Sequence, residues 1–189
     1  DYVATRWYRA PEILMGCSKY GASVDIWSVG CIIGELLAGK PLFRGASTMN
    51  QLQRIVTVID KPSDDDIDKL PSTYARKMLD SIQNGSLKTF KQMFPKGDAE
   101  AIDLLEKCLK FMPDERLTAE EILKHPWLKD FSSSGNEPEL THIVKLHFSD
   151  DEKYSVDTYR QKLYQEMKRS RKVRSSASRR RRVTSSSGR

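Results

Sequence analysis

The 189-residue sequence contains only three cysteines, Cys17, Cys31 and Cys108, and no CxxC pair. Three well-separated cysteines do not make a disulfide framework, so we expect reduced thiols that behave as small buried hydrophobes. No apolar run reaches the roughly 18 to 20 residues that span a bilayer, because Glu35 interrupts the best candidate, residues 29–37. No signal peptide is recognisable either. We therefore expect an intracellular protein, in the cytoplasm or the nucleus, with no membrane partner.

The alternation of apolar and polar residues that is typical of β-strands is not strong anywhere, and the sequence has no internal repeat. Nothing in it has the spacing of metal ligands. An initiator methionine is also missing, so we expect the chain to begin inside a larger protein. The sequence does contain 38% hydrophobic and 31% charged residues, which is the composition of an ordinary globular protein with one sizeable core.

The net charge of +6 comes from one end of the sequence. Residues 168–189 contain ten Lys or Arg and no acid, which leaves 22 basic and 26 acidic residues before them, a net charge of −4. The folded part is thus mildly acidic, and we do not expect nucleic acid as its partner. The basic segment has too little apolar surface to offset its ordering entropy, so we expect disorder there. Its Arg179–Arg182 run fits a nuclear-import signal, a phosphate-contacting arm, a basophilic-kinase target or a solvated tail.

Helical periodicity dominates the rest of the sequence. Residues 23–37 are apolar on nearly every face and precede Gly39, a good C-cap residue, so we expect a buried central helix. Asp25 in its first turn is expected to accept hydrogen bonds from unpaired backbone N–H groups. Residues 63–95 look like an insertion with short helical pieces such as 73–82. Further amphipathic helices are predicted at residues 47–59, 98–111, 118–125 (after an S/T-x-x-E capping box) and 156–167.

Three motifs follow one another along the chain: APE at residues 10–12, DIWSVG at 25–30 and PDER at 113–116. In this order and at these spacings, they resemble the C-terminal lobe of a eukaryotic protein kinase. ATRWYRAPE at residues 4–12 and KPLFRG at 40–45 are similar to the MAP kinases, which are CMGC serine/threonine kinases. The resemblance implies a mainly α fold, a kinase-like helical lobe that lacks the N-terminal β lobe and the catalytic loop.

Two further segments, residues 47–55 and 153–167, resemble the atypical, long-tailed extracellular-signal-regulated kinases. The resemblance also implies a division of the chain into three parts. These are a kinase C-lobe from the activation segment onward at 1–131 with a MAP-kinase-type insertion at about 63–95, an extension packing on the kinase body at 132–168, and a basic tail at 169–189.

The resemblance implies a phosphorylation switch near the start of the chain. In MAP kinases a T-x-Y motif directly precedes VATRWYRAPE; Tyr2 is its last residue, and its threonine falls before Asp1. A phosphotyrosine carries about −1.5 to −2 charges, which the planar guanidinium groups of Arg6 and Arg9 can bind bidentately. By spacing alone, these are ordinary surface residues. The resemblance further assigns the pocket for the residue after the phosphorylated Ser or Thr, proline in MAP kinases, to Ala4, Thr5, Arg6, Trp7, Tyr8 and Arg9.

Other matched residues have structural roles in this family. Glu12 and Arg116 are expected to form a buried ion pair that ties the activation segment to the helical lobe. Asp25, by resemblance, holds the backbone of the catalytic loop. His125 is expected to be a satisfied structural histidine and Trp27 to be core packing. An acidic cluster is either a solvated turn or a docking surface for basic motifs of partners, and it consists of Asp150, Asp151 and Glu152.

The resemblance implies a parent protein that uses ATP and Mg²⁺ to phosphorylate Ser or Thr before proline in protein substrates. An upstream activating kinase or autophosphorylation would switch it on. The Gly-rich loop, the phosphate-binding Lys, the Mg²⁺ ligands and the catalytic Asp are not in this sequence, since they precede the activation segment in kinases. We therefore expect no catalytic residue and no ATP or Mg²⁺ site in the chain, which alone would be inactive. The alternative is a non-catalytic docking or scaffold module, a truncated lobe with a basic tail.

Overall fold

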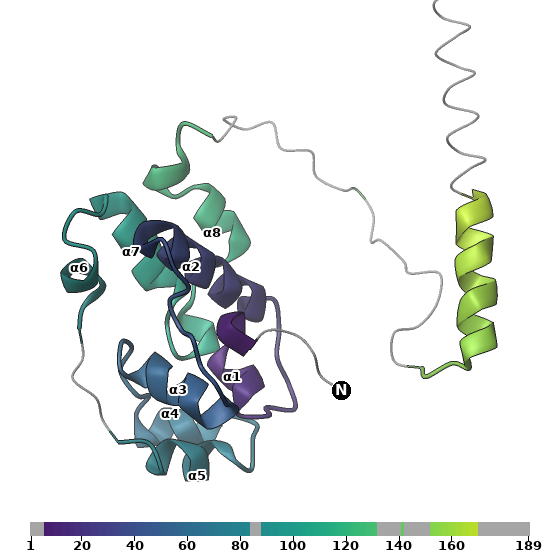
Figure 1. Ribbon diagram of the computed structural model, residues 1–189, viewed down its shortest axis with the longest axis horizontal. Helices are drawn as coiled ribbons and strands as arrows, with labels where there is room; N and C mark the ends of the chain where they lie inside the picture. Colours follow the sequence, from purple (N-terminus) through teal and green to yellow (C-terminus); the bar gives the residue numbers. More distant parts are fainter. Residues whose placement is uncertain (1–5, 84–87, 132–140, 142–151, 170–189) are drawn as a thin grey trace, which may run out of the picture. The chain divides into compact units, whose positions relative to one another are not determined.

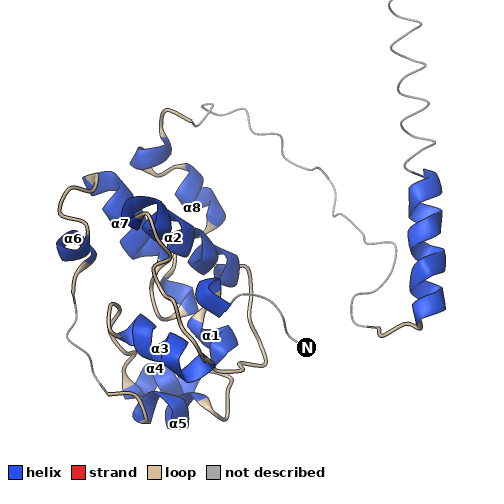
Figure 2. Ribbon diagram, viewed as in Figure 1, coloured by secondary structure: helices blue, strands red, loops and turns tan. Residues whose placement is uncertain are grey.

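The computed structural model describes residues 6–83, 88–131, 141 and 152–169, and the chain falls into two units, residues 1–137 and 138–189. All regular structure in the described residues is helical, without a strand (Figure 1, Figure 2). This confirms the mainly α fold. In the first unit the elements are η1 (Arg6–Tyr8), α1 (Pro11–Leu14), α2 (Ser23–Ala38), α3 (Thr48–Val56), α4 (Asp64–Lys69), α5 (Ala75–Asp80), α6 (Phe90–Met93), α7 (Ala99–Cys108), η2 (Pro113–Glu115), α8 (Ala119–Leu123) and η3 (Pro126–Leu128).

Helix α2 is the central helix of the first unit. It packs against α7, and the short helices η1 and η2 also contact it. Trp27 is fully buried, and Gly30 lets the two long helices approach closely, because a Cβ there would lie 2.7 Å from the side chain of Leu109. The helix ends at Gly39, whose φ of 66° is the left-handed conformation that favours glycine. The buried central helix and its glycine cap are thus confirmed.

Asp25 does not accept the backbone hydrogen bonds that its position in the first turn of α2 predicts. It lies in the first turn of α2, but it is exposed and caps nothing, and the N-cap residue is Ala22. The N–H groups of Val24 and Asp25 donate to the backbone carbonyls of Gly21 and Ala22 instead. The prediction that the Asp25 carboxylate accepts backbone hydrogen bonds is wrong, because the turn before the helix already supplies the acceptors.

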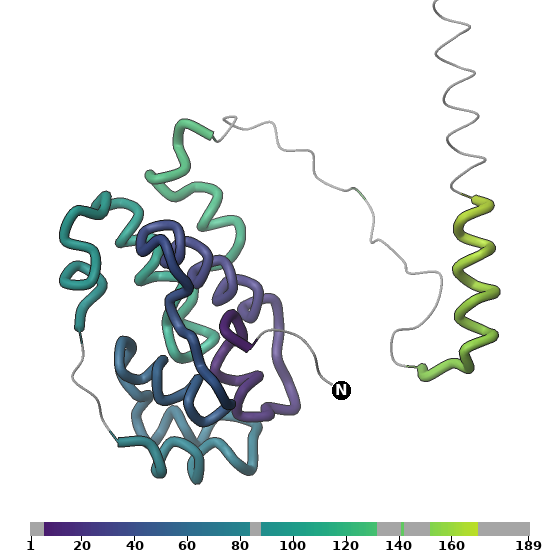
Figure 3. Tube along the Cα trace, viewed as in Figure 1, coloured from purple at the N-terminus to yellow at the C-terminus, as the bar shows by residue number. Residues whose placement is uncertain are grey.

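Helix α3 begins as the sequence predicts and ends earlier. The side chain of Ser47 accepts a hydrogen bond from the N–H of Asn50, which caps the helix start. The helix stops at Val56, where the spacing of the backbone bonds changes: the N–H of Val58 donates to the carbonyl of Ile55 only three residues earlier, and this carbonyl also accepts from Ile59. Figure 3 traces the chain from there through α4, α5 and α6 to α7, which returns to α2.

Local capping fixes the starts of α7 and α8. The carboxylate of Asp98 accepts from the N–H of Ala101 at 2.9 Å. Thr118 and Glu121 form a complete capping box, in which each side chain accepts a hydrogen bond from the other residue's backbone N–H. Both helix starts are therefore confirmed, because these signals depend on residues three positions apart.

The second unit contains one described helix, at residues 156–169, which starts where its periodicity predicts and runs two residues further. Its packing on a kinase body remains a prediction. No helix among the described residues is long and apolar enough to cross a membrane. Exposed apolar side chains on this helix are Val156, Tyr159, Leu163, Tyr164 and Met167.

The three cysteines are free and buried, which confirms their interpretation as small hydrophobes. Burial raises the pKa of the Cys31 thiol to about 12 and that of Cys108 to about 11. A thiol with such a pKa is protonated and unreactive near neutral pH, so both side chains serve as packing between α2 and α7.

Candidate functional site

The opening segment, residues 6–12, lies against two helices from later in the chain. Its short helix η1 contacts α2 and α3, and α1 contacts α3. Of the residues assigned to substrate recognition, Arg6, Trp7, Tyr8 and Arg9 are described and half-buried. The predicted phosphorylation site, Tyr2, and two residues of the predicted pocket, Ala4 and Thr5, lie outside the described part of the chain.

Trp7 is held by the loop before α3 and by α3 itself. Its indole Nε1–H donates to the carbonyl of Gly45 at 3.1 Å, and the guanidinium of Arg44 lies 5.5 Å from the centre of its ring. Its carbonyl accepts from Nε2 of Gln51 at 3.1 Å. Gln51 is fully buried, and its Oε1 accepts from the N–H of Gly45 at 2.8 Å. One side chain of α3 therefore joins the opening segment to the loop.

Tyr8 is held by α2. Its hydroxyl donates to Oε2 of Glu35 at 2.5 Å, and its carbonyl accepts from Oγ of Ser28 at 2.9 Å. The hydrogen bond to Glu35, together with burial and the negative charge of Glu35, raises the pKa of Tyr8 above 10.0. Two neighbouring residues of the opening segment are thus attached to two different helices.

Arg6 and Arg9 lie within one turn of each other. Nη1 of Arg6 donates to the carbonyl of Ala46 at 3.2 Å, and the backbone N–H of Arg9 donates to the carbonyl of Arg6. The loop that carries Ala46 thereby also orients the Arg6 side chain. Binding of a phosphate on Tyr2 by these two residues stays a prediction.

The structure brings Glu12 and Arg116 together, 104 residues apart in sequence. Nη1 of Arg116 donates to Oε1 of Glu12 at 2.7 Å and Nη2 to Oε2 at 2.8 Å, and the two side chains are only 0% and 3% exposed. The guanidinium also lies over Trp27, 5.0 Å from the ring centre. Its remaining bonds go to the backbone carbonyls of Lys110, Ser23 and Phe111. The buried charges are fully paired, and they attach α1 to the start of α2 and to the end of α7.

His125 lies in a local network at the end of α8. Its Nε2 is 2.9 Å from Oδ2 of Asp103, and its Nδ1 accepts from the N–H of Trp127 at 3.3 Å. Asp103 also binds Lys107 at 2.6 Å, and these two contacts, Lys107 first, lower the pKa of the Asp103 carboxyl. Both ring nitrogens of His125 have protein partners, which is the arrangement of a structural histidine.

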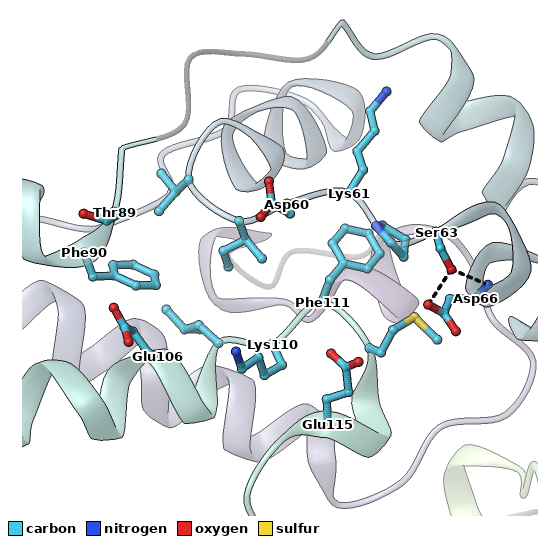
Figure 4. Close-up of a pocket in the computed structure, with 15 residues that line it drawn as sticks. Asp60, Lys61, Ser63, Asp66, Thr89, Phe90, Glu106, Lys110, Phe111 and Glu115 are labelled. Atoms are coloured by element: carbon cyan, nitrogen blue, oxygen red, sulfur yellow. Dashed lines mark hydrogen bonds between the residues drawn. The ribbon is translucent and has the colours of Figure 1, made fainter.

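Two cavities lie outside the opening segment. One of about 410 Å³ is lined by the α3–α4 loop, α6 and the end of α7, and Figure 4 shows Phe90 and Phe111 among its apolar walls and Glu106 and Lys110 among its charged ones. Another of about 820 Å³ is lined by the end of α2 and the residues before α7. In the described ranges, no group of three or more His, Cys, Asp and Glu is placed to hold a metal ion.

Of the acidic cluster Asp150, Asp151 and Glu152, the structure describes only Glu152, which is exposed, while Asp150 and Asp151 lie outside the described residues. A docking role for this cluster stays a prediction.

Sequence reasoning missed the residues that hold the opening segment in place: Gln51, Gly45, Ser28 and Glu35. One signal was available, because Gln51 stands four positions before Ile55, on the apolar face of a predicted amphipathic helix. A polar side chain at such a position is buried and needs partners, although the sequence does not say which.

Comparison with known proteins adds the family. The protein kinase domain model matches residues 1–128. Extracellular signal-regulated kinase 2 of Dictyostelium discoideum is 45% identical over 172 residues, 91% of this chain and 47% of that protein. Mitogen-activated protein kinase 15 of Xenopus laevis is 48% identical over 166 residues, 87% of this chain and 28% of that protein, and that of Mus musculus is 41% identical over 166 residues, 87% and 30%. The chain spans less than half the length of these relatives. The chain therefore belongs to the protein kinase family, and these relatives are MAP kinases.

Proposed function

We propose that the chain carries the substrate-positioning segment and the helical lobe of a proline-directed serine/threonine kinase of the MAP kinase type. The observation that carries the proposal is the double anchoring of Trp7 and Tyr8 to α3 and α2. An enzyme that orients a peptide hydroxyl for phosphoryl transfer needs a rigid surface beside it, since a small misplacement costs much of the rate. The hydrogen bonds that hold Trp7 and Tyr8 to two helices support such a surface in the opening segment.

The same bonds favour proline after the phosphorylated residue. The carbonyls of Trp7 and Tyr8 already accept hydrogen bonds from Gln51 and Ser28. A substrate residue with an N–H that finds no acceptor loses about 1 to 3 kcal/mol on burial, whereas proline has no N–H to satisfy. Preference for proline by roughly 5- to 150-fold follows from that difference.

The proposed switch is electrostatic. A phosphate on Tyr2 would pair with the guanidinium groups of Arg6 and Arg9 and fix the preceding part of the loop. An upstream kinase or autophosphorylation would supply it. The family implies ATP and Mg²⁺ for the whole protein, and we assign neither to residues of this chain.

We further propose that Asp150, Asp151 and Glu152 recruit basic docking motifs of partner proteins by charge complementarity. Replacing all three by Asn or Gln is expected to weaken the binding of a basic docking peptide in a salt-dependent way. An affinity unchanged by the triple replacement would remove this part of the proposal.

The experiment for the proposed activity is capture of the endogenous polypeptide with an antibody against residues 168–189, followed by a peptide kinase assay. Two peptides are compared that differ only in Pro or Ala after the acceptor Ser. We expect the Pro peptide to be favoured at least about fivefold in kcat/KM, and tyrosine phosphatase treatment to lower the rate. Equal rates for the two peptides, or no rate above a capture from cells lacking the gene, would contradict the proposal.

A further inference from the structure

We infer that Gln51 is a positioning residue for the substrate-binding segment, acting through Trp7 and the loop at residues 44–47. The inference rests on the proposed function, because it assigns a further residue to the same site. It starts from the hydrogen bonds of one amide. Gln51 comes from α3 and is fully buried, so it does not contact a substrate itself.

The three residues form a closed ring of hydrogen bonds. Nε2 of Gln51 donates to the carbonyl of Trp7, Oε1 of Gln51 accepts from the N–H of Gly45, and the carbonyl of Gly45 accepts from Nε1 of Trp7. A carboxamide both donates and accepts at one end, so this one side chain satisfies both backbone groups. A Glu at this position keeps an acceptor for Gly45 but turns a second oxygen toward the carbonyl of Trp7.

Packing around the ring is as demanding as its hydrogen bonds. A Cβ on Gly45 would lie 2.3 Å from Oε1 and 2.6 Å from Cα of Gln51, so any larger residue there must displace the loop or the helix. Glycine is needed at this position because of a close approach between two backbones. The loop and α3 are therefore closely packed, and Trp7 is bonded to both.

A change in this ring should affect substrate recognition more than folding. Tyr8 keeps its own anchors on α2 when Gln51 is changed, through its hydroxyl bond to Glu35 and its carbonyl bond from Ser28. Only the Trp7 side of the segment loses its support. The loop on that side also carries Ala46, so its carbonyl, which orients Arg6, loses support as well. A change at Gln51 therefore loosens the surface offered to the residue after the acceptor Ser while the segment stays attached to the core.

The test compares variants of the complete endogenous polypeptide, introduced at its gene and captured through residues 168–189. Gln51→Met keeps the length of the side chain without its amide, and Gly45→Ala disturbs the same ring from the loop. Gln53→Met is the matched control, because this glutamine of α3 donates to the carbonyl of Gln83 at an exposed position. Measured quantities are kcat and KM for the Pro and Ala peptides, and hydrogen exchange of residues 6–9 and Gly45, with α7 as an internal reference.

We expect Gln51→Met and Gly45→Ala to lower the Pro-to-Ala ratio of kcat/KM from at least about fivefold to near 1. Exchange of the Gly45 amide should rise about tenfold or more, with α7 unchanged. Gln53→Met should alter neither quantity. If the wild type prefers the Pro peptide but Gln51→Met and Gly45→Ala keep the wild-type ratio, the inference is overturned. Unchanged exchange of the Gly45 amide in these variants would also overturn it. If the wild type shows no preference for Pro, the proposed function fails, and the exchange measurement still decides whether Gln51 positions the segment.

Discussion

Replacing Arg116 by Ala should destabilise the fold strongly, and the size of the effect follows from its contacts. The change leaves the Glu12 carboxylate buried without its partner and takes a donor from three backbone carbonyls. Breaking a buried ion pair from one side costs about 3 to 5 kcal/mol. At roughly 2 to 4 °C per kcal/mol for a chain of this size, the melting temperature should fall by roughly 6 to 20 °C.

Differential scanning calorimetry measures this shift, and Arg76→Ala is the matched control. Arg76 also binds two carboxylates, those of Asp64 and Asp68, but it is 43% exposed and its partners are 83% and 69% exposed. Exposed pairs contribute about 0 to 1 kcal/mol, so this variant should melt within a few degrees of the parent. A Glu12→Gln, Arg116→Met double variant should recover part of the loss, since neither charge is left buried alone. An Arg116→Ala protein that melts within about one degree of the unmodified protein would show that the buried ion pair does not stabilise the fold.

Two further predictions concern α2. Gly30→Ala should lower the unfolding free energy in urea by about 1 to 3 kcal/mol, because the new Cβ meets Leu109 at 2.7 Å and Cys108 at 2.9 Å. Gly21→Ala is the control, and it should change the unfolding free energy by no more than about 0.5 kcal/mol, since a Cβ there has nothing within 4 Å. Equal effects of the two variants would contradict this packing. The pKa of Cys31 is raised from 9.0 to about 12, so the folded state holds the thiol proton more tightly than the unfolded state does. This stabilisation is complete below pH 9 and is lost as the pH rises toward 12. Above pH 9 the unfolding free energy should therefore fall less steeply with pH in Cys31→Ala than in the unmodified protein. Identical slopes for the two proteins would count against the burial of the thiol.

The sequence predicted the elements whose signals are local. The apolar run before Gly39 identified the central helix, and Asp98 and Thr118 identified two helix starts, because a cap and the N–H that it accepts lie three residues apart. Local rules were insufficient at Asp25, where the preceding turn had already supplied the backbone acceptors. They were also insufficient at the end of α3, where the chain turns while the apolar spacing continues to Ile59.

The candidate site depends on partners that are distant in sequence. Gln51 bonds to Trp7 across 44 residues, and Arg116 bonds to Glu12 across 104. The ion pair was expected only because the motifs resemble a kinase lobe, since spacing alone does not bring two such residues together. For Gln51, periodicity indicates burial, but the identity of its partners requires the fold.

Whether the chain is part of a MAP-kinase-type enzyme can be tested by the mass and peptide coverage of the endogenous polypeptide captured through residues 168–189. We expect a species well above 21.7 kDa whose peptides include an HRD catalytic-loop motif and a DFG motif. A species near 21.7 kDa without these motifs would contradict this expectation and would leave a lobe that acts by binding alone.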